Sequence, residues 1–253
     1  MKWEALTSKE LGHLDRNIPV VVPIAAVEQH GPHLPVATDS LIADHFMAEL
    51  NSALADQVLT LPTIRIACSE HHMFFTGTLT ATHETFLAYL REVMESVIHH
   101  GFERIIIFNC HGGNLGIGQV ALEKLGYRHP NARFTLVTWW RLVAAQLAEV
   151  QDSEAGGVGH ACEFETSLLM HFAPDQVRTE FIPSTMTNLP TFPWAEGDML
   201  KGSAASLYRR MDQMTPNGVY GAPFMASALK GRTISHLVTT ALSLLVNDIR
   251  AIR

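Results

Sequence analysis

Apolar runs of strand length alternate along this chain with segments of helical periodicity, and this alternation limits the possible folds more than any other feature. The clearest run is 104–109, whose Ile-Ile-Ile-Phe core is typical of a strand that is buried on both faces. Because strands separated by helices usually pair in parallel, the pattern predicts a mainly parallel sheet with helices on both faces. We therefore expect an α/β fold.

The predicted elements account for most of the chain, whose 253 residues are enough for a single α/β domain, 1–253, with a large core. Segment 181–231 is rich in Pro, Gly, Thr and Met, and we expect a long loop or lid there rather than a second domain. Strands are predicted at 18–27, 58–67, 104–109 and 134–140, and helices at 40–55, 82–100, 115–127, 163–172 and 233–252.

Composition excludes several classes of function. The formal net charge is −7 and no block of Lys and Arg occurs, so nucleic-acid binding is not expected. No apolar run approaches the roughly 18 residues of a membrane span, and the N-terminal segment 1–7 lacks the apolar core of a signal peptide. Three scattered cysteines predict no disulfide framework. We therefore expect a cytoplasmic protein that contacts neither membranes nor nucleic acids.

The first polar segment after a predicted strand contains three metal-binding residue types, Glu28, His30 and Asp39. Glu28 and His30 lie two residues apart just beyond the strand 18–27, and alternate residues of a strand point the same way. Their side chains are therefore expected to converge, with Asp39 joining them after a short loop. Taken alone, Asp39 or Thr38 is better explained as a cap of the next helix.

Two later segments add further ligand types. His111 follows the strand 104–109, so it shares the carboxyl edge of the sheet, where ligands gather in such folds, with Glu28 and His30. With Asp39 and Glu163, the set comprises two histidines and three carboxylates, which suit Zn²⁺, Mn²⁺ or Fe²⁺. One open catalytic zinc takes about three protein ligands. We therefore expect two divalent ions, most readily Zn²⁺, with Asp39 as the bridging carboxylate. This interpretation requires the Glu163 side chain to lie within bonding range of one of the two ions.

His160 is the candidate general acid or base, and Glu163 is placed beside it as a second catalytic residue. The alternative for His160 is a supporting or capping role at the helix that follows. Glu165 lies two residues beyond Glu163, so on a helix it faces away from Glu163. We expect Glu165 to form a structural ion pair or to support a ligand from behind.

Four residues are candidates for substrate binding. Gly112, Gly113 and Asn114 allow the backbone to approach the site closely and open a helix whose N–H groups could bind an anion or a carbonyl oxygen. A plain tight turn explains these three residues equally well. His72 lies in a polar, aromatic loop after a predicted strand, where it either contacts substrate or is an ordinary loop histidine.

These motifs resemble those of the creatininase, or creatinine amidohydrolase, family, and their order spans nearly the whole chain. Four segments resemble the family's signatures: Glu-x-His-Gly-x-His-Leu-Pro with a later Asp (Glu28, His30, Gly31, His33, Leu34, Pro35, Asp39), His-Met-x-Phe-Pro-Gly-Thr (His72, Met73, Phe75, Gly77, Thr78), Asn-x-His-Gly-Gly-Asn (Asn109, His111, Gly112, Gly113, Asn114), and His-Ala-Gly with Glu-Thr-Ser (His160, Ala161, Glu165, Thr166, Ser167).

The resemblance implies a three-layer αβα sandwich, a dinuclear metal centre and hydrolysis of a non-peptide C–N bond. It also implies a homo-oligomer, often a hexamer. By resemblance the metal ligands are Glu28, His30, Asp39 and His111, and the catalytic histidine is His160.

The chain departs from the creatininase pattern at the metal site. Creatininases have an acidic ligand two residues after the histidine of the Asn-x-His motif, and here that position is Gly113. Glu163 stands where creatininase has an apolar residue, so a carboxylate from a neighbouring loop is expected to fill the same coordination site, as in formamidopyrimidine deformylases. Thr76 replaces the usual Pro and Cys162 replaces the Gly, which argues against creatinine itself as substrate.

The sequence therefore predicts a metal-dependent amidohydrolase that acts on a small cyclic amide or formamide by metal-activated water. One alternative is a peptidase that trims a modified peptide. A second is a metal-stabilised binding protein without turnover.

Overall fold

Four parallel strands form one sheet in the order β2-β1-β3-β4 in the computed structural model, which describes residues 1–252. The register places Ile24 beside Asn109, and Asn109 beside Thr138, so three strands end level at one carboxyl edge. The predicted parallel sheet is confirmed. Its strands are β1 (Val20–Ile24), β2 (Leu59–Thr60), β3 (Arg104–Asn109) and β4 (Arg133–Thr138).

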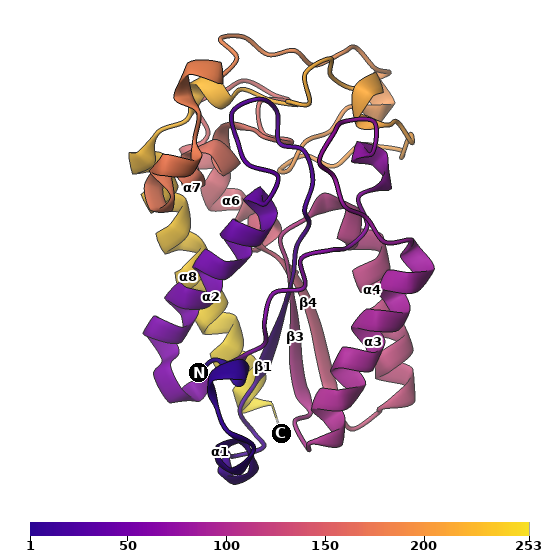
Figure 1. The fold of residues 1–253 in the computed structure, drawn as a ribbon, viewed down its shortest axis with the longest axis vertical. Helices are drawn as coiled ribbons and strands as arrows, with labels where there is room; N and C mark the ends of the chain where they lie inside the picture. The colour runs from indigo at the N-terminus through magenta and orange to yellow at the C-terminus, as the bar shows by residue number, and fades with distance from the viewer. Residues whose placement is uncertain (253) are drawn as a thin grey trace.

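Helices cover both faces of this sheet and create two apolar cores (Figure 1). Val21 and Ile106 point into the core beneath one helical layer, whereas Val20 and Ile105 point into the other, as the alternation of side chains along a strand requires. The predicted three-layer αβα sandwich is confirmed. The first layer contains α2 (Thr38–Leu54), α5 (Trp139–Leu142), α6 (Ala144–Val150), α7 (Glu163–Phe172) and α8 (Ala228–Ala251), and the second contains α3 (His83–His99) and α4 (Leu115–Arg128). A short α1 (Ser8–His13) precedes the sheet.

Helix ends follow the sequence signals in α3 but not in α2. Thr82 caps α3 by accepting a hydrogen bond from Thr85 N, and Gly101 follows with φ +87°, a conformation that favours glycine. In α2 the N-cap is Ala37, so Thr38 and Asp39 lie inside the first turn and the prediction that one of them caps the helix is wrong. Asp39 is thereby free to point toward the carboxyl edge.

Three predicted strands are shorter in the structure, and α8 is longer. The strand predicted at 18–27 is reduced to β1. The strand predicted at 58–67 is reduced to β2, because Pro62 has no N–H to donate and the ladder resumes only as an isolated bridge between Ile24 and Ile64. The predicted strand 134–140 ends at Thr138, where α5 begins. Helix α8 begins at Ala228, capped by Ser227, rather than at 233.

The segment between α7 and α8 crosses the carboxyl edge of the sheet, as the orange-to-yellow chain at the top of Figure 1 shows. Within the described chain its regular structure is limited to short 3₁₀ helices such as Pro193–Ala195 and Met211–Gln213. The prediction of a long covering loop at 181–231 is thus correct up to the start of α8. Within residues 1–252, every helix is too short or too polar to cross a lipid bilayer.

Candidate metal centre

Polar side chains from distant parts of the chain meet in a buried cluster at the carboxyl edge. Glu28 and His30 follow β1, Asp39 lies in the first turn of α2, and His111 follows β3. All four are at most 3% exposed, in a protein interior where a charge must be compensated. The structure therefore brings together four of the five residues that the sequence suggested as metal ligands.

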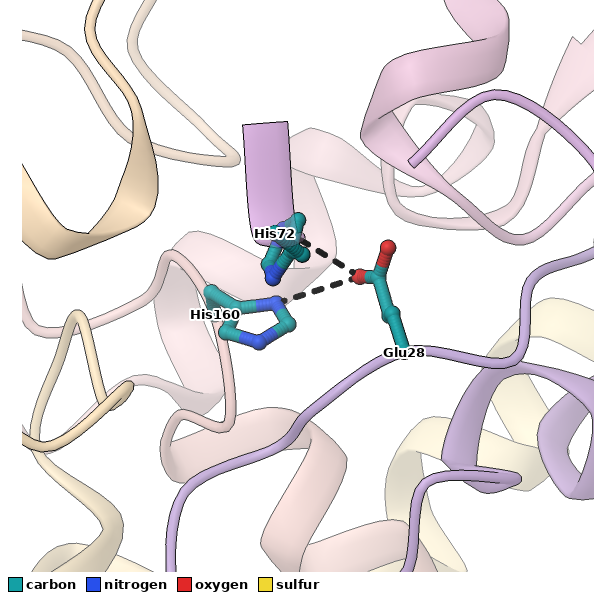
Figure 2. A group of neighbouring side chains, drawn as sticks. All are labelled: Glu28, His72 and His160. Atoms are coloured by element: carbon teal, nitrogen blue, oxygen red, sulfur yellow. Dashed lines mark ion pairs between the residues drawn. The ribbon is translucent and has the colours of Figure 1, made fainter. Parts of the chain in front are cut away.

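Glu28 is the carboxylate around which the histidines gather. Its Oε1 lies 3.2 Å from His111 Nδ1, 3.5 Å from His72 Nε2 and 3.5 Å from His160 Nδ1. Figure 2 shows the last two rings side by side, both turned toward this oxygen. Its second oxygen, Oε2, has no hydrogen-bond partner among the described residues. An anionic oxygen that is buried without a donor is the environment that a cation would satisfy.

Asp39 faces two histidines with different oxygens. Oδ1 lies 3.2 Å from His30 Nε2, and Oδ2 lies 3.2 Å from His111 Nδ1. A carboxylate so placed can contact two neighbouring ions, which is the geometry that the predicted bridging role needs. Neither Asp39 Oδ2 nor His30 Nε2 makes a hydrogen bond to any residue in 1–252.

The far nitrogens of both histidines fix which ring nitrogen faces the carboxylates. His111 Nε2 donates to Cys68 O at 2.9 Å, and His30 Nδ1 donates to Glu28 O at 3.1 Å. Since a carbonyl oxygen only accepts, the other nitrogen of each neutral ring presents a lone pair to the carboxylates. Lone pairs that face anions repel unless a proton or a metal ion lies between them. Metal-ligating histidines typically show this carbonyl support.

The electrostatics of the cluster agree with this interpretation. Burial lowers the pKa of His111, but the Glu28 and Asp39 carboxylates outweigh it and raise that pKa to about 10. Burial also lowers the pKa of His30, but the Asp39 and Glu165 carboxylates outweigh it and raise that pKa well above its usual value. The pKa of Asp39 is lowered, because the two histidines outweigh the effect of burial. The cluster thus attracts positive charge strongly.

The structure reverses the roles predicted for Glu163 and Glu165, the two carboxylates at the start of α7. Glu165 Oε1 lies 3.9 Å from His30 Nε2 and groups with His30 and His160 as a potential metal-binding set. Glu163 points to the opposite side of the helix, so it does not share the cluster with Glu28 or Asp39. The prediction that Glu163 is the fifth ligand and a catalytic residue is therefore wrong. The two residues do face apart, but the inner one is Glu165.

Glu163 instead belongs to a buried ion-pair network. Lys230 on α8 donates through Nζ to Glu163 Oε1 and to Met225 O, the latter at 2.8 Å, and also lies 2.7 Å from Asp152 Oδ2. The backbone N–H groups of Asp152 and Ser153 donate to the two Glu163 oxygens at 2.9 and 3.1 Å. The charge of Glu163 is therefore fully compensated without a metal ion.

Gln29 connects the two remaining histidines, and the sequence did not single it out. Gln29 Nε2 lies 2.9 Å from His72 Nδ1 and 3.1 Å from His160 Nε2. The shorter contact of His160 is with Gln29 O at 2.7 Å, so Nε2 carries the proton and Nδ1 faces Glu28. Burial, reinforced by His30, lowers the pKa of His160 to about 3. His160 is therefore neutral at pH 7.

Two glycines in the loop after β3 have different roles: Gly113 allows a close contact of the His111 ring, and Gly112 lines the cleft. A Cβ at Gly113 would collide with Cys68 O and His111 Nε2, so only glycine allows the His111 ring its carbonyl partner. Gly112 lines the cleft described below. Asn114 does not, because its amide binds Ala25 O at 3.0 Å and Cys68 N at 3.4 Å.

A cleft of about 690 Å³ opens above the cluster. Its floor includes Glu28, Asp39, His111 and Glu165, and its upper wall comes from 195–203 and 211–220 of the covering segment. This wall comes from the segment 181–231, where the sequence predicts a loop or lid that takes part in the substrate pocket, although no motif there identifies the substrate. Trp140 and Tyr220, which the sequence suggested for the substrate pocket, also line the cleft, as does Lys201 of the segment 181–231. Two further lining side chains, His71 and Arg141, were not predicted.

The sequence matches a family model described as "Creatininase: Creatinine amidohydrolase" over residues 4–246. A relative from Mycobacterium tuberculosis, the mycofactocin precursor peptide peptidase, is 30% identical over 223 residues, which cover 85% of this chain and 79% of that protein.

Solved structures share the fold. A putative creatinine amidohydrolase from Bacteroides fragilis superposes with a TM-score of 0.83 at 20% identity, covering 100% of this chain and 97% of the other. A mutant creatininase of Zn-Zn type superposes with a TM-score of 0.81 at 19% identity, covering 99% and 98%. At these identities the likeness supports the αβα architecture.

Proposed function

Since this chain belongs to the creatininase family, whose members are hydrolases acting on C–N bonds, we propose that it hydrolyses an amide C–N bond with water activated by two divalent metal ions. The observation that carries the proposal is a set of buried atoms without a hydrogen-bond partner among the described residues, His30 Nε2, Asp39 Oδ2 and Glu28 Oε2, with His111 Nδ1 3.2 Å from Asp39 Oδ2. A proton shared with the carboxylates would satisfy one histidine–carboxylate pair. Because His30 faces one oxygen of Asp39 and His111 faces the other, two cations would satisfy the cluster better than one proton.

The donors divide into two sets that share Asp39. Glu28 and His111 lie with one of its oxygens, and His30 and Glu165 lie with the other. Imidazole and carboxylate donors suit Zn²⁺ first, and Mn²⁺ or Fe²⁺ also. When bound, two such ions would lower the pKa of a water molecule to about 7 and polarise a carbonyl group.

His160 is the proposed proton carrier. It is neutral at pH 7, its Nε2–H is held by Gln29 O, and its Nδ1 faces the cluster beside Glu28. Nδ1 can therefore accept a proton from the attacking water and return it to the leaving nitrogen. His72 receives a hydrogen bond from Gln29 at Nδ1, so its Nε2–H points at Glu28 and can orient that carboxylate or a substrate oxygen.

The proposed substrate is a small cyclic amide or a formamide. A peptide is the second candidate, and two observations favour it: the cleft volume of about 690 Å³ exceeds what a small ring needs, and the 30% identical relative is named a peptide peptidase. In both cases the scissile carbonyl would lie above the Glu28, Asp39 and His111 floor.

Substrate profiling of the protein reconstituted with Zn²⁺ or Mn²⁺ tests these proposals. Cyclic amides, formamides and short peptides are assayed for C–N cleavage, and His160→Gln serves as the catalytic control. Turnover that falls about 10²–10³-fold in His160→Gln supports the proposed reaction. Metal binding without turnover of any amide by the unmodified protein contradicts it and favours a metal-stabilised binding protein.

Two finer expectations accompany this proposal. We expect a cytoplasmic enzyme and a homo-oligomer, with a hexamer first, because the family resemblance implies that assembly. Sedimentation of the metal-loaded protein measures the assembly directly.

A further inference from the structure

Two cationic side chains that are not candidate metal donors line the cleft. Arg141 extends from α5, directly after β4, and Lys201 extends from the covering segment. Both side chains are exposed to the cleft solvent, and neither forms an ion pair with any residue in 1–252. One follows the sheet and the other belongs to the covering segment, so two parts of the chain each bring a positive charge without an ion-pair partner to the same cleft.

The position of Lys201 is fixed by its own turn. Asp198 Oδ1 accepts hydrogen bonds from Leu200 N at 2.9 Å and Lys201 N at 2.8 Å, and Asp198 N donates to Lys201 O at 2.8 Å. Asp198 Oδ2 accepts from Gly156 N at 3.1 Å. This turn is therefore tied to the segment that leads to His160, so the lysine and the proposed proton carrier belong to one framework.

The charges of the cleft wall do not cancel. Asp198 is the acidic residue nearest to Lys201 in the chain, but three backbone N–H groups already satisfy its oxygens. The remaining acidic side chains of the lining, Glu28, Asp39 and Glu165, belong to the metal cluster on the floor. In a protein with a net charge of −7, two unpaired cations on the wall of one cleft indicate an anionic ligand group.

We propose that Arg141 and Lys201 bind a carboxylate group of the substrate while the metal cluster holds its scissile amide. The proposal rests on the proposed function and narrows the substrate class to amides that carry a free carboxylate. A planar guanidinium matches a carboxylate with two parallel hydrogen bonds, and the lysine adds a point charge from the covering segment. Such a contact, remote from the reacting bond, would fix the direction in which the substrate enters.

Paired probes that differ only in the carboxylate test the inference. N-formylglycine, acetyl-Ala-Ala and the C-terminal amide of each are titrated calorimetrically into Zn²⁺-loaded protein with His160→Gln, which prevents consumption. At least one acid should bind about 10-fold tighter than its amide. The double variant Arg141→Gln/Lys201→Gln should reduce this preference to less than about 3-fold. The matched control Lys9→Gln/Lys124→Gln removes two exposed lysines outside the cleft lining and should leave it unchanged.

Two outcomes would overturn the inference. The first is equal binding of acid and amide in every pair. The second is an acid preference that persists in Arg141→Gln/Lys201→Gln, because the metal ions would then be the groups that bind the carboxylate. Failure of the proposed reaction is distinguishable, because it would show as absent turnover by the unmodified protein while the acid preference and its loss in the double variant remained.

Discussion

Two glutamates at the start of α7 occupy opposite environments although only one residue separates them. Glu163 is surrounded by donors, with Lys230 Nζ and the backbone N–H groups of Asp152 and Ser153 on its oxygens. Glu165 faces His30 across 3.9 Å in a cluster that contains two further carboxylates. Glu163 has a lysine as its counter-charge, whereas Glu165 accepts one backbone N–H, from Cys162 at 3.3 Å, and has no Lys or Arg partner among the described residues.

This difference shows how to separate a structural acid from a metal ligand. Both side chains are buried, at 0% and 3% exposure, so burial alone does not distinguish them. The distinguishing feature is the partner. Glu163 contacts a lysine and two donating backbone amides, whereas Glu165 has one backbone amide and otherwise faces the imidazole of His30. Removing a residue from the first environment should cost stability, and removing one from the second should cost metal and activity.

The largest effect is expected from Asp39→Ala, which removes the carboxylate between His30 and His111. Both ions should be lost, and activity should fall by about 10³-fold or more. Elemental analysis after gel filtration measures the metal content. Asp44→Ala is the matched control on the same helix, because Asp44 binds Thr63 and Arg65 instead. Unchanged metal content in Asp39→Ala would contradict the bridging role.

Lys230→Met probes the structural side of the comparison. It leaves the Glu163 charge buried without its cation, which should lower the free energy of unfolding by about 3–5 kcal/mol and Tm by roughly 10 °C. Adding Glu163→Gln should recover most of the loss, since the amide oxygen still accepts from the backbone. Lys124→Met, an exposed control, should stay within about 0.5 kcal/mol. A destabilised single variant that the second change fails to rescue would show that packing, not charge, is responsible.

Gly113→Ala sharpens the comparison from the side of His111. The new Cβ would displace the ring from Cys68 O, the carbonyl that directs its lone pair toward the cluster. Metal affinity should weaken by about 10–100-fold while the fold persists. Competition with a zinc chelator measures the affinity. Gly112→Ala is the control, because nothing lies within 4 Å of a Cβ there. Equal affinity of both variants would argue against this role of the glycine.

The smallest effect concerns His45, a half-buried histidine that contacts neither Glu163 nor Glu165. Burial, with His171 nearby, lowers the pKa of His45 to about 4, and its ring stacks on Phe172 and contacts Ser235 Oγ at 2.6 Å. Because the folded pKa lies below the unfolded value of about 6.5, its contribution to stability is complete above pH 6.5 and declines as the pH falls toward 4. Denaturant unfolding of the metal-free protein at pH 7 and pH 5 should show this decline.

His45→Gln keeps a hydrogen-bonding side chain that does not titrate, so it should unfold with a smaller difference between the two pH values. An identical difference in the variant would assign the acid sensitivity to the cluster histidines instead.

The fold was predictable because its strands and helices have strong local signals. The Ile-Ile-Ile-Phe strand and the capped helix α3 have nearly the predicted bounds, whereas Pro62 cut short the strand predicted at 58–67. Which face of α7 turns toward the metal cluster was not predictable. A spacing of two residues says that Glu163 and Glu165 face apart, but Lys230, 67 residues after Glu163, decides which one points inward.

The same limit explains the other missed site residues. Gln29 would turn away from Glu28 and His30 on a strand, but β1 ends at Ile24, so the extended loop brings all three side chains to one site. Arg141 and Lys201 meet at the cleft only because the covering segment returns across the sheet. Such contacts depend on tertiary structure and leave no trace in local sequence patterns.

The most direct test is the metal content of two isosteric variants of α7, measured by elemental analysis at matched protein concentration. Glu165→Gln should retain fewer than the two ions per chain expected for the unmodified protein and should lose activity, whereas Glu163→Gln should retain both ions and lose mainly stability. The reverse pattern, or identical metal content in both variants, would contradict the assignment of Glu165 to the metal cluster.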